Sequence, residues 1–189
     1  SSVAHAGFIL TGFLGARSLG EIHAGDINPV QAVLFYVTTY GLTTMAAFAI
    51  VTVVRDAGGE ATHLSRWAGL GKESPLVAGI FAFLLLGMAG IPLTSGFTGK
   101  WAVFAAALSA GAWPVVIVAV LMSAVAAYFY VRVIVVMFFA DPVGDGPSVA
   151  VPSVLTSSVI AVGAAATLVL GVVPGPLLDM LGRIAEFIR

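Results

Sequence analysis

The sequence contains no cysteine and few charged residues. Charged side chains make up 9% of the 189 residues, whereas soluble domains carry about 25%. Without cysteine the chain cannot form a disulfide, a thiolate zinc site or a cysteine-ligated iron–sulfur cluster. The formal net charge of −1 provides no excess of basic residues, so nucleic acid is not expected as a partner.

Other familiar signals are also missing. His5, His23 and His63 are scattered without the spacing of metal ligands, so no metal site is expected. No nucleophile elbow, P-loop or dinucleotide fingerprint is present. The chain opens on Ser1 and Ser2 with no initiator methionine, basic segment or cleavage site. We interpret it as the C-terminal piece of a longer membrane protein.

Hydrophobic residues make up 60% of the chain and form long uninterrupted runs, which indicates a lipid environment. We predict an all-α, polytopic transmembrane helix bundle of about five spans, one of them broken, plus a C-terminal amphipathic helix. The whole chain, residues 1–189, is expected to form a single membrane domain. The spans are expected at 3–19, 30–54, 75–110, 113–139 and 154–173, and a helix on the membrane surface is expected at 176–188.

The apolar segment 75–110 is too long for one straight span. Its 36 residues would extend about 54 Å as a helix, against a hydrocarbon core of about 30 Å. Residues 90–98 contain glycines, a proline and hydroxyl residues, which do not suit a helix interior. One interpretation is a single crossing made of two half-helices, which lipid tolerates only beside protein or water. The other is a tight surface hairpin between two short spans.

Lys100 is the ionisable residue hardest to explain by structure alone. It follows the break and lies about 16 Å by helical rise from Gly111, too far for its amine to reach the membrane surface easily. Burial and a position near the start of the second half-helix, capped by Thr94 or Ser95, would both favour the neutral amine. We therefore expect a proton-transfer role. Arg17 and Arg132 lie closer to span ends and are interpreted as snorkelling side chains.

Several other polar residues fall within the predicted spans. An unperturbed histidine titrates near neutral pH, and proton transfer and helix packing both remain open for His5. Span 30–54 carries hydroxyls with helical spacing, which either form helix-packing bonds or line a polar path. Tyr128 and Tyr130 are interpreted as an aromatic belt. The residues of a polar path through the membrane would be Tyr40, Thr43, Thr44, Thr94 and Ser95.

Four segments also carry a family resemblance. They are residues 1–7 (SSVAHAG), 40–44 (YGLTT), 89–100 (AGIPLTSGFTGK) and 128–133 (YFYVRV). Together they resemble the antiporter-like subunits of respiratory complex I, the bacterial proton-pumping NADH:quinone oxidoreductase, and among these the subunit N family. The chain is similar to roughly the last two-fifths of such a subunit.

The resemblance implies a fold of two inverted repeats, each with a broken helix and a proton half-channel. It implies that Lys100 is the proton-carrying lysine of the second repeat and that His5 is the histidine of the neighbouring helix. The expected function is then proton translocation in the bacterial inner membrane, as a non-redox subunit among other membrane subunits. FMN and iron–sulfur clusters would belong to partner subunits, and quinone to the whole complex. The alternatives are a subunit of a cation/proton antiporter or membrane-bound hydrogenase, and a purely structural membrane subunit.

Overall fold

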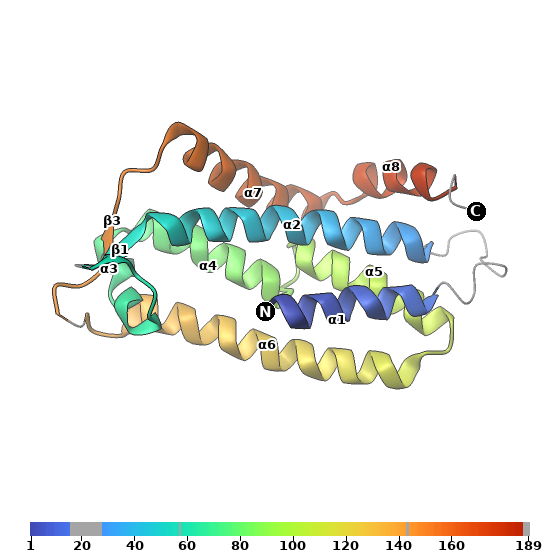
Figure 1. The fold of residues 1–189 in the computed structure, drawn as a ribbon. Coiled ribbons are helices and arrows are strands. Elements are labelled where there is room, and N and C mark those ends of the chain that lie inside the picture. The colour runs from blue at the N-terminus through green and yellow to red at the C-terminus, as the bar shows by residue number, and fades with distance from the viewer. Residues whose placement is uncertain (16–27, 57, 143, 187–189) are drawn as a thin grey trace.

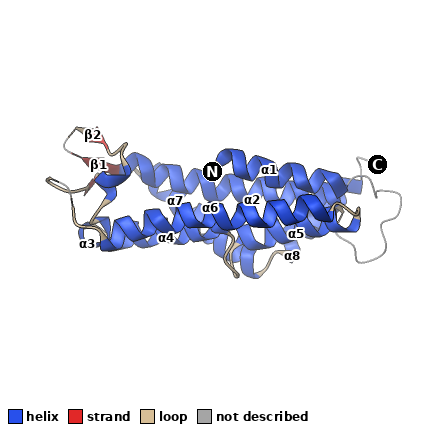
Figure 2. Ribbon diagram, turned by 90° about the horizontal axis from the view of Figure 1, so that it is seen from below, coloured by secondary structure: helices blue, strands red, loops and turns tan. Residues whose placement is uncertain are grey.

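The computed structural model describes residues 1–15, 28–56, 58–142 and 144–186. Its helices pack lengthwise into an elongated bundle (Figures 1 and 2). In chain order they are α1 (Ser2–Phe13), α2 (Pro29–Val53), α3 (Leu70–Glu73), α4 (Pro75–Ala89), α5 (Ser95–Ser109), α6 (Trp113–Phe139), α7 (Val154–Val172) and α8 (Gly175–Glu186). The predicted all-α bundle is therefore confirmed. That the chain forms a single membrane domain stays a prediction.

Within the described residues, α2, α6 and α7 are long and apolar enough to cross a membrane. Local chemistry sets the start of α2, because the Asn28 side chain accepts the Val30 N–H at 2.9 Å and Pro29 occupies the first helical turn. The chain is thus a multi-pass membrane protein. Helix α1 is shorter than the span predicted there, and residues 16–19 of that span lie outside the described residues.

Helices α4 and α5 form one broken helix. They follow one another along the bundle in both views, beside the continuous α2 and α6 (Figures 1 and 2), so the hairpin interpretation is wrong. Helix α4 ends because Gly90 adopts a left-handed conformation with φ of 88°, and Pro92 cannot continue a helix. Leu93 also has positive φ, at 72°.

The break is shorter than the sequence suggests, since α5 already begins at Ser95. Gly96, which counted as a helix breaker, and its neighbour Gly99 lie inside this helix. Their role is close packing. An added Cβ at Gly96 would lie 1.9 Å from the Gly87 carbonyl oxygen, and one at Gly99 would lie 2.4 Å from the Tyr36 ring.

The C-terminal helices close the other side of α2. Helix α7 ends level with the break, where Thr98 Oγ1 donates to the Gly171 carbonyl at 3.4 Å. Helix α8 then runs beside the first half of α2 (Figure 1), and Gln31 Nε2 donates to the Leu178 carbonyl at 2.7 Å. Leu181 is buried on its apolar face. The amphipathic helix predicted here is present, while its position on a membrane surface stays a prediction.

Segments 55–74 and 140–152, which connect predicted spans, meet at one end of the bundle. Strands β1 (Val54–Asp56), β2 (Gly59–Glu60) and β3 (Ser148–Val149) form a small antiparallel sheet in the order β2-β1-β3. A single 3₁₀ turn, Leu64–Trp67, follows β2. This sheet joins the end of α2 to the segment between α6 and α7, and so holds the long helices together at that end.

Candidate functional site

Lys100 lies in the second turn of α5, with 6% of its surface exposed. Its amine Nζ donates three hydrogen bonds, to the Met88 carbonyl at 3.0 Å, the Ala89 carbonyl at 2.8 Å and Ser123 Oγ at 2.8 Å. An ammonium has three N–H donors, so this environment satisfies all of them. In the described part of the chain Lys100 forms no ion pair with an acidic residue.

The Met88 and Ala89 carbonyls lack their helical N–H partners because the helix is broken here. In an uninterrupted helix the Met88 carbonyl would accept from the N–H of residue 92, but Pro92 has no N–H. The Ala89 carbonyl would accept from Leu93, whose backbone has turned to positive φ. Both acceptors therefore belong to the unsatisfied carboxyl end of α4.

The sequence places Lys100 near the start of α5, where a helix dipole opposes a positive charge. The Lys100 side chain instead reaches across the break to the last carbonyls of α4, where the dipole is negative and supports an ammonium. Gly90 gives it room, since an added Cβ there would lie 3.1 Å from Nζ. The amine also lies 5.1 Å from the centre of the Phe8 ring.

His5 lies on α1 with 1% of its surface exposed. Its Nδ1 is 2.8 Å from the Tyr36 hydroxyl and its Nε2 is 3.1 Å from the Tyr130 hydroxyl. Its ring stacks on Tyr40 at 4.1 Å between centroids. A neutral imidazole has one donor and one acceptor nitrogen, so one tyrosine accepts from His5 and the other donates to it.

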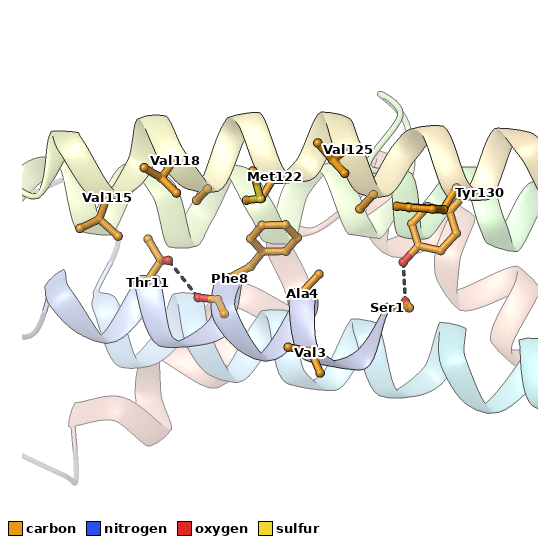
Figure 3. Close-up of a pocket in the computed structure, with 14 residues that line it drawn as sticks. Ser1, Val3, Ala4, Phe8, Thr11, Val115, Val118, Met122, Val125 and Tyr130 are labelled. Carbon is orange, nitrogen blue, oxygen red and sulfur yellow. Dashed lines mark hydrogen bonds between the residues drawn. The ribbon is translucent and has the colours of Figure 1, made fainter.

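Tyr130 corrects an expectation. The sequence placed it with Tyr128 in an aromatic belt, but Tyr130 is buried against His5, whereas Tyr128 is 64% exposed. The Tyr130 hydroxyl also hydrogen-bonds Ser1 Oγ (Figure 3). Ser123, which the sequence argument missed entirely, precedes Tyr130 by seven residues and lies on the same face of α6. That spacing was the available signal for both residues.

Phe8 and a small cavity separate His5 from Lys100. The Phe8 ring meets the His5 ring edge-on at 5.7 Å. Beside it, a cavity of about 10 Å³ is lined by residues of α1, α2, α4 and α5, namely His5, Tyr36, Thr39, Tyr40, Thr43, Gly87, Met88 and Gly96. This volume is about that needed for one water molecule. Met88 takes part in both environments, because it lines this cavity and its carbonyl also accepts a hydrogen bond from Lys100.

The other predicted path residues divide between different surroundings. Tyr40 and Thr43 line the small cavity, and Tyr40 also lines, together with Thr44, a groove of about 160 Å³ beside Tyr130. Thr94 takes the N-cap position of α5, but its hydroxyl donates to the Ile91 carbonyl at 2.7 Å instead of capping the helix. The buried hydroxyls of Thr44 and Ser95 find no hydrogen-bond partner among the described residues.

The remaining cations lie elsewhere. Arg132 is exposed on α6, and Arg17 lies outside the described residues. In the described part of the chain, no three histidine or acidic side chains gather in a way that could hold a metal ion.

A larger groove runs between α1 and α6. It has a volume of about 590 Å³ and a mostly apolar lining, including Val118, Met122 and Val125. In Figure 3 the Phe8 ring extends from α1 toward Met122 on α6. Since Phe8 also lies against Lys100, this aromatic side chain contacts both the groove and the amine.

Comparison with known proteins adds the family context. The family model described as NADH:quinone oxidoreductase/Mrp antiporter, transmembrane, matches residues 1–126. The NADH-quinone oxidoreductase subunit N of a Nocardioides species is 62% identical over 193 residues, covering 100% of this chain and 36% of that protein. The chain spans about a third of the length of such relatives.

Solved structures share the fold. A chain of respiratory complex I from Thermus thermophilus with bound aureothin matches with a TM-score of 0.76 and 31% identity, covering 95% of this chain and 38% of that one. A chain of the Mrp complex from a Dietzia species matches with a TM-score of 0.68 and 21% identity, over 95% of this chain and 46% of that one. The second similarity concerns the fold alone.

Proposed function

The chain belongs to the NADH:quinone oxidoreductase/Mrp antiporter transmembrane family, and we propose that it is a proton-translocating part of an NADH:quinone oxidoreductase. In this proposal it forms part of a longer subunit N in a bacterial inner membrane, next to other membrane subunits. It carries out no redox chemistry itself. FMN and iron–sulfur clusters would lie in partner subunits, and the complex as a whole would reduce quinone.

The observation that carries the proposal is the buried Lys100 at the break. An ionisable group inside the membrane is costly unless its surroundings support it, and here the end of a half-helix provides that support. The relatives' names support the redox complex, since a protein 62% identical to this chain is called NADH-quinone oxidoreductase subunit N.

The geometry supports a mechanism in which Lys100 and His5 each hold a proton in turn. Lys100 holds the proton as an ammonium that is hydrogen-bonded to the α4 carbonyls. His5 receives a proton at one ring nitrogen and releases one from the other, because both nitrogens contact tyrosine hydroxyls. His5, Tyr36 and Met88 all line the small cavity, and the Met88 carbonyl accepts from Lys100, so a single water there would lie between the His5–Tyr36 pair and the surroundings of Lys100. Tyr40, Thr43, Thr44, Thr94 and Ser95 are proposed as polar neighbours of this path.

Two substitutions of Lys100 test the proposal in the assembled complex. Lys100→Met removes the amine, and we expect proton pumping to fall sharply while the complex still assembles. Lys100→Arg keeps a positive charge and donors, but arginine does not release its proton. We therefore expect Lys100→Arg to assemble well and to pump poorly. The measurement is proton uptake by membrane vesicles per NADH oxidised.

The control is Lys72→Met, which removes an exposed lysine in α3. It should leave pumping unchanged. Normal pumping by Lys100→Met would refute the relay. Normal pumping by Lys100→Arg together with failed assembly of Lys100→Met would favour the structural role. An antiporter or hydrogenase subunit would be indicated instead if the chain purified without NADH-driven quinone reduction.

A further inference from the structure

Ser123 is the side chain that α6 contributes to the amine of Lys100. It is half-buried, and its Oγ lies 2.8 Å from Nζ. The other two partners of the amine are backbone carbonyls of α4. Ser123 is therefore the one side-chain hydroxyl among the hydrogen-bond partners that the structure gives Lys100.

The three partners differ in what they do when the amine loses its proton. An ammonium has three donors and no acceptor, whereas a neutral amine has two donors and one lone pair. Carbonyl oxygens only accept, so neither Met88 nor Ala89 can bond to that lone pair. A serine hydroxyl both accepts and donates. Of the three, only Ser123 can therefore both accept from the ammonium and donate to the lone pair of the neutral amine, whose two remaining N–H groups can stay with the carbonyls.

The hydroxyl hydrogen of Ser123 is also available to form a hydrogen bond with the neutral amine of Lys100. Hydroxyl residues inside helices commonly donate to a carbonyl one turn back, and several in this chain do so. Thr11 donates to the Gly7 carbonyl at 2.9 Å, and Thr39 donates to the Phe35 carbonyl at 2.9 Å. Among the described contacts, Ser123 Oγ has no such bond to its own helix, and its partner is Lys100.

We propose that Ser123 is a positioning residue for proton transfer at Lys100. Its hydroxyl accepts from the ammonium, and after deprotonation it rotates and donates to the lone pair of the neutral amine. The reversal leaves the serine uncharged throughout, and the proton that leaves Lys100 passes to another acceptor on the path. The amine is thus held beside α6 in both states. This inference rests on the proposed function of Lys100.

A matched pair of substitutions in the assembled complex tests the role of the hydroxyl. Ser123→Thr retains the hydroxyl, and Ser123→Val has nearly the same shape as threonine without it. One hydrogen bond of ordinary strength corresponds to a change of about three- to tenfold. We expect Ser123→Val to lower the protons pumped per NADH oxidised by about that factor, and Ser123→Thr to restore them to near the parent value.

The controls separate this inference from the proposed function. Ser158→Val removes an exposed hydroxyl of α7 that donates to its own helix, and it should pump normally. If Lys100→Met abolishes pumping but Ser123→Val pumps normally, the inference fails and the proposed function stands. If Lys100→Met pumps normally, the proposed function itself fails.

Assembly is measured for every variant. If Ser123→Val does not assemble, Ser123→Ala replaces it, because alanine removes the hydroxyl without adding a methyl group. Equal loss of pumping in the threonine and valine variants would overturn the inference, since the hydroxyl would then not matter. Failure of both the valine and the alanine variants to assemble would overturn it as well, because Ser123 would be needed for packing.

Discussion

Gly96→Ala should damage both the stability of the bundle and the environment of Lys100. Gly96 lies in the first turn of α5 and packs directly against Gly87 of α4. A Cβ at this position would lie 1.9 Å from the Gly87 carbonyl oxygen of α4. Both atoms are attached to backbone, so no flexible side chain can move aside. The two half-helices must shift relative to each other.

The size of the shift follows from the geometry. Real Cβ atoms almost never come within 3.0 Å of another group, so the separation must grow from 1.9 Å to at least 3.0 Å, which is 1.1 Å or more. The Lys100 amine is carried by α5, and its carbonyl acceptors are 2.8 and 3.0 Å away on α4. A shift of that size would stretch these contacts toward about 4 Å, beyond hydrogen-bonding distance. Overpacking of this kind costs about 1–3 kcal/mol of folding stability.

The matched control is Gly79→Ala. Gly79 is also helical, lies in α4, and has nothing within 4 Å of an added Cβ. Thermal unfolding of the purified complex and proton pumping per NADH oxidised are measured for both variants. Gly96→Ala should unfold at a lower temperature and pump less, whereas Gly79→Ala should match the parent or be slightly more stable, since alanine favours a helix. Equal behaviour of the two variants would refute the close approach of the half-helices.

Two further predictions concern packing elsewhere in the bundle. Thr43 and Thr167 join α2 to α7 by a hydroxyl–hydroxyl hydrogen bond of 2.8 Å. A double-mutant cycle with valine at both positions should show a coupling of about 0.6 kcal/mol in the unfolding free energy. Strictly additive effects of the two substitutions would refute this prediction. Trp67 stacks on Phe81 and donates from Nε1 to the Ala61 carbonyl at 2.9 Å. Trp67→Phe should therefore cost about 1–2 kcal/mol in unfolding free energy, while Trp113→Phe, at a position 61% exposed, should cost much less.

Features set by neighbouring residues were predictable from the sequence. The break follows from Gly90 and Pro92, which act on the backbone within one turn. Helix α6 covers residues 113–139, the range expected from an apolar run bounded by turn residues. Lys100 was singled out because a charge inside an apolar run is costly wherever the rest of the chain lies.

Features that depend on distant parts of the chain were not predictable. Ser123 and Tyr130 look like ordinary helix residues until α6 is packed against α1 and α5, which brings them to Lys100 and His5. The pairing of Val54 with Val149 joins two loops that the sequence leaves unrelated. Gly96 was interpreted correctly as unusual but for the wrong reason, since its lack of a side chain serves contact with Gly87 and not helix breaking.

The break and the lysine stabilise each other. The freed carbonyls of Met88 and Ala89 need donors, because an unpaired backbone group in a membrane costs several kcal/mol. The Lys100 ammonium in turn needs acceptors in an apolar environment. Each satisfies the other across Gly90, so removing Lys100 also leaves two carbonyls without their donor. Lys100→Met should therefore lose some stability together with pumping, and Lys100→Arg, which still carries donors, should lose pumping with less loss of stability. If both variants lost stability equally, the hydrogen bonds from the Lys100 amine to the carbonyls of Met88 and Ala89 would not be what stabilises the end of α4.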